Sequence, residues 1–205
     1  MSIALSACST TQPVNTAANT VNAGQLPRLG QRYGTTDRDL SAFKWSNTNN
    51  TQSPNLYQLS LTNVPGTVML QVTYAKTPDG RRRVSDVEFY KPEMSTHAAM
   101  SSRTLQALRH SYIPGGSLRL RLSTIGGNIR DMFSQADSSS TGKTLTSFYQ
   151  SDAVAKRETS FRVKPCSADS GERGLVIVST IENTKGGVDE MFITDAAVHY
   201  CGKLI

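Results

Sequence analysis

Alternating apolar and polar positions recur along the chain and predict a series of short β-strands. Residues 55–61 and 67–74 carry an apolar side chain at every second position, as half-buried strands do, and residues 84–90 repeat this pattern. Turns separate these strands at residues 63–66 and 77–80, where Pro fixes φ and Gly accepts the left-handed conformation that follows. This stretch therefore predicts an antiparallel meander.

After the third predicted strand the pattern changes to a helical period. Apolar side chains recur at helical spacing up to Tyr112, and Ser95 or Thr96 provides the expected N-terminal cap. Residues 117–124 return to alternation, with leucines at every second position and Arg119 and Arg121 between them. We therefore expect a strand whose leucine face is buried.

The last quarter of the chain again predicts strands. Residues 159–164 and 175–181 fit this pattern, and the second is so rich in β-branched apolar residues that a central position is expected. Residues 188–193 and 196–200 predict a hairpin or a bent last strand. The whole pattern predicts a β-rich α+β domain over residues 55–205, an antiparallel sheet or sandwich with one main helix.

Residues 9–54 differ from this domain in composition. They are rich in Ser, Thr, Asn, Gln, Ala and Gly and contain few large apolar residues, which is typical of a flexible linker. We therefore expect a disordered N-terminal tether. No run in the chain approaches the roughly 18 uninterrupted apolar residues that a membrane-spanning helix requires, so no such helix is expected.

The segment Leu5-Ser6-Ala7-Cys8 resembles the lipobox of bacterial lipoproteins, in which an apolar residue and two small residues precede an acylated cysteine. The resemblance implies that residues 1–8 are the remnant of a lipoprotein signal and that Cys8 carries lipid. By the same resemblance, Ser9 implies delivery to the outer membrane, facing the periplasm. The alternative is a cytoplasmic protein in which Cys8 is an ordinary thiol.

The other two cysteines, Cys166 and Cys201, lie near the ends of predicted strands and predict a disulfide bond. In an oxidising compartment, a bridge that closes a loop of 35 residues adds roughly 3 to 4 kcal/mol in the chain-entropy model. The alternative is a pair of buried thiols. His199 lies two residues before Cys201 and would share its face in a strand, but a bridge removes Cys201 as a nucleophile.

Signals for catalysis or cofactor binding are weak. Gly142-Lys143-Thr144 matches the end of a phosphate-binding loop, but Asp137 occupies the position of its first glycine, so we expect a polar surface loop. His97, His110 and His199 are too far apart in sequence for a metal-site motif. We expect a protein that is not an enzyme and that needs no metal or cofactor.

Basic residues are concentrated in the middle of the chain. The net charge is +6, and residues 76–130 hold ten basic and four acidic residues. Seven of the arginines are candidates for one basic interaction patch: Arg81, Arg82, Arg83, Arg103, Arg109, Arg119 and Arg121. Such a patch favours anionic lipid, lipopolysaccharide or an acidic protein surface. Nucleic acid is not favoured, because the aromatic residues are few and do not alternate with the arginines.

Taken together, these features predict a lipid-anchored, periplasm-facing structural or interaction protein. We expect other envelope proteins as its partners, in a multiprotein assembly of the secretion or conjugation type, and the membrane as its attachment through the lipid. Two alternatives stay open. One is an envelope hydrolase whose site is not visible in the sequence, and the other is a cytosolic or phage-type structural protein.

Overall fold

The computed structural model describes residues 20–21, 25–46, 52–61, 67–91, 99–125, 129–130, 143–164, 173–183, 185–201 and 203–204. Cys8 and Cys166 lie outside these ranges. The lipidation and disulfide predictions therefore rest on the sequence.

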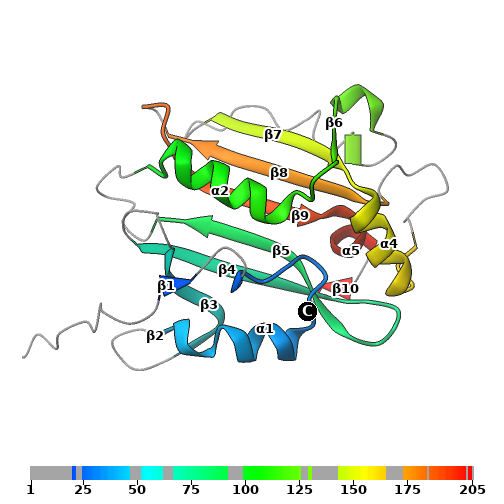
Figure 1. Ribbon diagram of the computed structural model, residues 1–205, viewed down its shortest axis with the longest axis horizontal. Helices are drawn as coiled ribbons and strands as arrows, with labels where there is room; N and C mark the ends of the chain where they lie inside the picture. The colour runs from blue at the N-terminus through cyan, green and yellow to red at the C-terminus, as the bar shows by residue number, and fades with distance from the viewer. Residues whose placement is uncertain are drawn as a thin grey trace, which may run out of the picture.

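A single sheet forms the centre of a β-rich α+β fold (Figure 1). In the described part it contains ten strands: β1 (Thr20–Val21), β2 (Lys44–Ser46), β3 (Gln52–Leu61), β4 (Thr67–Lys76), β5 (Arg82–Tyr90), β6 (Leu118–Leu120), β7 (Lys143–Gln150), β8 (Leu175–Glu182), β9 (Val188–Asp195) and β10 (Lys203–Leu204). Their order is β1-β3-β4-β5-β9-β8-β7-β6, with β2 beside β3 and β10 beside β4. Only β1 and β3 pair in parallel among these strands, so the predicted antiparallel sheet is confirmed.

The central strands form where the sequence alternates, because their apolar side chains point to one face. Tyr57 and Leu59 of β3 are buried beside Val68, Leu70 and Val72 of β4 in the main hydrophobic core. In β8 the first four residues, Leu175 to Val178, are all buried, as expected for a strand covered on both faces. The predicted meander is present as β3, β4 and β5, and β9 continues the sheet beyond it.

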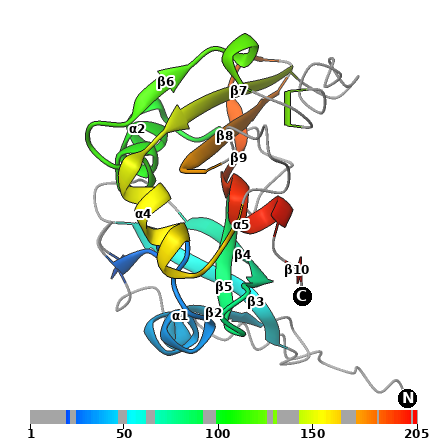
Figure 2. The ribbon, with the colours of Figure 1, turned by 90° about the vertical axis from the view of Figure 1, so that its right-hand side faces the viewer.

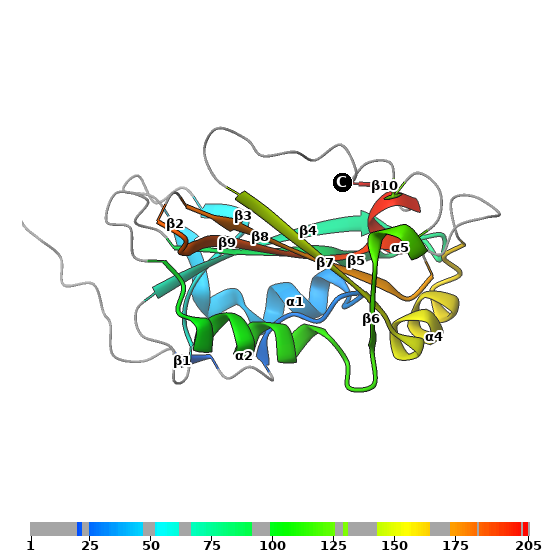
Figure 3. The ribbon, with the colours of Figure 1, turned by 90° about the horizontal axis from the view of Figure 1, so that it is seen from above.

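Helices cover the sheet unequally. The described helices are α1 (Tyr33–Asp39), α2 (Ser102–Tyr112), α4 (Asp152–Ser160), α5 (Ala196–Cys201) and the short 3₁₀ helices η2 (Ser41–Phe43) and η3 (Leu122–Thr124). Figures 1 and 3 show α1, α2 and α4 on one side of the sheet, here called the helical face, and α5 on the other, here called the α5 face. Leu108 of α2 and Val154 of α4 join the main core. None of the described helices has the length and apolar character needed to cross a bilayer.

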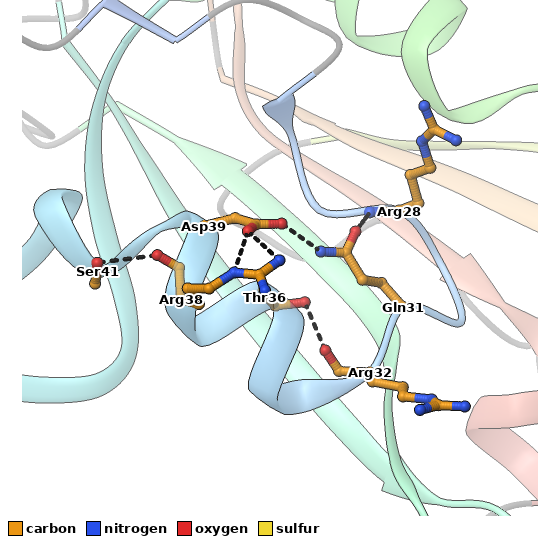
Figure 4. A network of polar contacts seen from close by, with 7 residues as sticks. All are labelled: Arg28, Gln31, Arg32, Thr36, Arg38, Asp39 and Ser41. Atoms are coloured by element: carbon orange, nitrogen blue, oxygen red, sulfur yellow. Dashed lines mark hydrogen bonds and ion pairs between the residues drawn. The ribbon is translucent and has the colours of Figure 1, made fainter.

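The folded domain begins earlier than the composition suggested, so the tether prediction for residues 9–54 is wrong over residues 25–46. Leu26, Leu29 and Leu40 are buried in the main core, and α1 lies between them. A network of polar contacts holds this segment (Figure 4): Arg28 donates its backbone N–H to Gln31, Gln31 and Arg38 donate to the carboxylate of Asp39, Thr36 donates to the Arg32 carbonyl, and Ser41 donates to the Arg38 carbonyl. A few well-spaced leucines therefore outweigh the polar composition.

Two predicted strands near the C-terminus are helices instead. Residues 159–164 are the end of α4 and the turn after it, and residues 196–200 belong to α5. Each helix begins at a capping side chain, because Ser151 Oγ accepts the N–H of Val154 and Asp195 Oδ1 accepts the N–H of Val198. These caps outweigh the apolar, β-branched residues that suggested strands.

The predicted strand at residues 117–124 is shorter than expected and its leucine face is not wholly buried. β6 covers only Leu118–Leu120, and η3 follows at once. Leu120 and Leu122 pack against a small core, whereas Leu118 is 68% exposed. The reason is its position, because among the described strands β6 pairs only with β7 and so lies at an edge of the sheet.

Candidate functional site

A groove of about 640 Å³ runs along α2 on the helical face. Its lining comes from one stripe of α2, from the loop after it and from β7: Ser102, Leu105, Gln106, Arg109, His110, Ile113, Pro114, Gly115, Gly116, Ser117 and Tyr149. The α2 residues recur every three or four positions, which places them on one side of the helix. One side of α2 therefore forms a wall of the groove.

α2 is held firmly on the sheet, which fixes the shape of the groove. Ser101 Oγ caps the helix by accepting the N–H of Thr104 at 3.1 Å, whereas the sequence suggested a cap at residue 95 or 96, outside the described residues. Leu108 and Tyr112 are buried, and the Tyr112 ring meets Phe89 edge to face at 5.8 Å between centroids. Gly116, with φ of 80°, allows the tight turn that leads into β6.

The charge around this groove has one sign. Residues 99–125 contain four arginines and no Asp or Glu. Arg109 lines the groove, and its buried Nε has no hydrogen-bond partner in the described part of the chain. Arg119 lies opposite Tyr149 in the β6–β7 pairing and donates a hydrogen bond to Ser147 Oγ at 3.3 Å. The groove thus presents positive charge that the described residues do not neutralise.

The arginines of the β4–β5 hairpin have a different environment. Arg83 is buried, where it donates to Asp79 Oδ2 at 2.6 Å and to the Gly30 carbonyl at 3.2 Å, and lies 3.5 Å above the Phe161 ring. Arg82 stacks over Tyr33 at 4.4 Å, and only Arg81 is fully exposed.

The structure therefore does not bring the seven predicted patch residues together. Arg83 is buried, so it adds nothing to a surface. In the sheet, β9, β8 and β7 separate β5, which carries Arg82, from β6, which carries Arg119. Figure 2 shows this separation, with β6 at the top and β5 near the bottom. Arg103, Arg109, Arg119 and Arg121 remain as a group in one segment, while the hairpin arginines lie elsewhere.

A second hollow, of about 430 Å³, lies on the α5 face. It is lined by Thr73, Asp86, Glu88, Thr144, Ser179, Ile181, Phe192, Thr194 and His199. His199 Nδ1 lies 2.6 Å from Asp86 Oδ2, which also accepts a hydrogen bond from Ser85 Oγ at 2.7 Å. Sequence analysis missed this pair, because the two residues are 113 positions apart. α5 brings His199 over β5, where a strand would have carried it away from Asp86.

This hollow has an acidic side. Burial raises the pKa of the Glu88 carboxyl, and the nearby charge of Glu190 raises it further. In the sheet, Phe192 of β9 lies between Glu88 of β5 and Ser179 of β8. Chemically, the hollow can hold a proton on Glu88, and the Asp86 carboxylate can orient the His199 ring.

A third cluster of ionisable groups centres on two buried carboxyl groups. Glu158 of α4 is 1% exposed and Asp195, at the end of β9, is 0% exposed. Burial raises the pKa of Glu158 well above its usual range, and the charge of Asp195 raises it further. Burial also raises the pKa of Asp195, against the lowering effects of the Val198 N–H and of Arg157. The two carboxyl groups therefore share a proton in the folded domain.

The remaining predicted site residues give a mixed result. Cys201 is half-buried at the end of α5, and Cys166 lies outside the described residues, so the bridge stays a prediction. His97 also lies outside them, and His110 is exposed at the groove. Within the described ranges, no three His, Cys, Asp or Glu side chains form a group that could hold a metal ion.

Comparisons with protein-family models, with curated proteins and with solved structures gave no match.

Proposed function

We propose that this protein is a lipid-anchored component of a cell-envelope multiprotein assembly and that it works by binding another protein. The observation that carries the binding role is the groove along α2, which combines a volume of about 640 Å³ with a lining whose described residues include no Asp or Glu. Binding sites for other molecules are usually preformed concave surfaces with apolar walls and a few polar groups. This groove has that character.

The anchoring part of the proposal is supported by the sequence. Leu5-Ser6-Ala7-Cys8 supplies the lipobox-like segment, and the first described strand, β1 (Thr20–Val21), pairs with β3 in the sheet. In sequence, residues 9–19 separate Cys8 from this strand, fewer than in the tether first expected. A domain connected in this way stands close to the membrane surface, facing other envelope proteins.

Metabolic labelling with a palmitate analogue tests the anchoring part. We expect the wild-type chain, expressed with the DNA that lies upstream in its own genome, to incorporate label and to fractionate with membranes. Cys8→Ser should lose both properties, and Cys201→Ser should keep them. Unlabelled wild-type protein in the soluble fraction would exclude lipid anchoring.

Crosslinking in intact cells tests the binding part. A photoreactive amino acid at Gln106, inside the groove, should crosslink to one envelope protein, and the same probe at Arg81 should not. This binding proposal predicts that Arg109→Gln removes the crosslink. Equal crosslinking from both positions would exclude the groove as the binding surface.

Hydrolysis is a second candidate function, and one observation favours it. Asp86 and His199 meet at 2.6 Å in the hollow on the α5 face, the arrangement in which a carboxylate orients an imidazole for general-base catalysis. Chromogenic esters provide a test, since His199→Gln should abolish turnover while Arg109→Gln leaves it unchanged. Equal rates for wild type and His199→Gln would dismiss this function.

A further inference from the structure

We propose that the groove along α2 binds a short acidic segment of a partner protein, in which a carboxylate pairs with Arg109 and an apolar side chain enters the groove. This inference rests on the proposed binding function and names the chemistry of the partner. It follows from the charge, the lining and the length of the groove.

The groove carries basic side chains without acidic ones among its described residues. Among the described residues, its lining contains Arg109 and His110 but no Asp or Glu, and residues 99–125 contain no acidic residue. By contrast, Arg38, Arg83 and Arg157 each lie within 4.0 Å of a carboxylate of the chain itself. Arg109 lines the groove and pairs with no carboxylate of the described residues, so a carboxylate from another molecule can complete its pairing.

Arg109 is the residue placed to select the charge. Its Nε is buried and unpartnered among the described residues, while the side chain as a whole is only partly buried and lines the groove. A guanidinium group offers several donors in a fixed plane, which matches the two oxygens of a carboxylate. A carboxylate in the groove pairs with the guanidinium group through the donors that line it, since Arg109 is one of the lining residues.

Apolar side chains around Arg109 limit the occupant to a segment with an apolar anchor. Leu105 lies one turn before Arg109 on α2, Ile113 follows the end of the helix, and Tyr149 of β7 also lines the groove. Leu118 adds a large exposed apolar side chain close in sequence to Ser117 of the lining. An apolar side chain between charged residues of the partner would cover these surfaces.

The length of the groove fits a short peptide. Ser102 and Ile113 mark the ends of the lining on α2. At a rise of about 1.5 Å per residue this stretch is about 16 Å long, which an extended segment of about five residues spans. The groove therefore suits a linear acidic segment better than a broad protein surface.

Fluorescence anisotropy with the purified 205-residue chain tests this inference. The probe is a fluorescein-labelled seven-residue peptide of Asp and Glu with one central Leu. Its matched control has Asn and Gln at the acidic positions. The variants are Arg109→Gln, in the groove, and Arg81→Gln, an equal charge change at the exposed hairpin residue.

We expect the acidic peptide to bind at least about tenfold more tightly than its amide control, because hydrogen bonds to charged groups are the strong ones. Arg109→Gln should weaken the acidic peptide by about tenfold and Arg81→Gln by less than about twofold. Added salt should weaken binding to the wild type. Equal binding of the two peptides, or equal effects of the two substitutions, would overturn the inference.

A separate measurement distinguishes an anionic membrane from a peptide as the occupant. Phosphatidylglycerol vesicles, which are anionic, should compete with the peptide no better than phosphatidylcholine vesicles, which are neutral overall. Selective competition by phosphatidylglycerol would overturn the peptide assignment. If the peptides fail while Gln106 still crosslinks to a partner, the proposed function stands and only the acidic chemistry is wrong.

Discussion

Two sets of arginines were predicted to form one basic surface, but they have different environments in the structure. The hairpin set, Arg81 to Arg83, forms an unbroken basic run, yet Arg83 is buried against Asp79 and Phe161 and Arg82 stacks over Tyr33. The second set, Arg103, Arg109, Arg119 and Arg121, is scattered through residues 99–125, and Arg109 of this set lines the groove; none of the four pairs with a described carboxylate. A run of basic residues is therefore not evidence of a basic surface.

The difference has a simple physical origin. The side chains of a β-strand alternate between its two faces, so neighbouring arginines in β5 cannot share one surface. The β4–β5 turn also supplies an acidic partner, because Asp79 precedes Arg83 by four residues. Residues 99–125 contain no acidic residue, so nothing within that segment draws its arginines inward.

Arg83→Ala should have the largest effect on stability. The substitution removes the pairing with Asp79, the hydrogen bond to Gly30 and the contact with Phe161. It also leaves the Asp79 carboxylate, only 16% exposed, without its cation. We expect a loss of about 3 kcal/mol in the free energy of unfolding, measured by urea denaturation.

Arg81→Ala is the control, and it should change stability by less than about 0.5 kcal/mol because its side chain is exposed. Arg83→Lys should fall between the two, since Lys keeps the charge but loses the planar stacking over Phe161. A similar small effect for Arg83→Ala and Arg81→Ala would mean that the hairpin arginines stabilise the fold no more than Arg109 does.

Glu158→Gln should have the next largest effect, and one that depends on pH. Burial and the neighbouring Asp195 raise the pKa of Glu158, so the folded state keeps its proton above the ordinary value of 4.5. The stability from this proton is fully present below pH 4.5 and is lost as pH rises toward the folded pKa. Gln mimics the protonated form, so the variant should be on the order of 2 kcal/mol more stable than wild type at pH 8.

Thermal unfolding at pH 5 and pH 8 checks this prediction. Wild type and Glu158→Gln should be similar at pH 5 and should differ at pH 8. Other charged groups face this pair, namely Arg157, Arg173 and Asp86. Arg157→Gln should deepen the loss at high pH, because it removes the cation nearest to Asp195. The same pH dependence in wild type and Glu158→Gln would show that the carboxyl pair is not protonated in the folded state.

Much of the sheet was predictable from the sequence, and two helices were not. β3, β4, β5, β8 and β9 all lie where alternating or continuous apolar residues predict strands. α4 and α5 were missed because the main helical signal of each is one capping residue, Ser151 or Asp195. A single capping residue is a weak signal beside apolar periodicity. Residues 25–46 were assigned to the tether because composition averages over the few leucines that fold them.

The candidate sites were less predictable, for reasons of geometry. Arg109 was identified by charge, but the groove that it lines depends on where α2 lies relative to β7. Asp86 and His199 were not connected at all, because only the docking of α5 over β5 brings them together. Such contacts depend on how elements pack, which local sequence patterns do not determine.

The dependence of stability on acid should report the pairing of Arg83 with Asp79. Burial of Asp79 opposes ionisation, but hydrogen bonds from Arg83, Thr77 and the Arg81 backbone lower the pKa of Asp79 to about 2. The stability from this carboxylate is present above the ordinary value of 3.8 and is lost as pH falls toward 2. We expect Asp79→Asn to cost on the order of 1 kcal/mol at pH 7.

Urea denaturation between pH 2 and pH 5 measures this effect. Asp79→Asn should flatten the decline in stability with acid relative to wild type, because the titrating group is gone. Asp39→Asn serves as the control, since its partner Arg38 lies at the exposed surface. A curve for Asp79→Asn that runs parallel to that of wild type would mean that Arg83 does not hold this carboxylate in its ionised form.

The smallest effect on stability is expected at the groove, and it separates a binding residue from a structural one. Arg109→Gln and Arg121→Gln should each change the free energy of unfolding by less than about 0.5 kcal/mol, because no described carboxylate pairs with them. The double variant should be no less stable than wild type at low salt, since it removes like charges from one segment. Urea denaturation at 20 mM and 500 mM salt checks this expectation. A loss at Arg109 approaching that at Arg83 would make the groove arginines part of the framework of the fold.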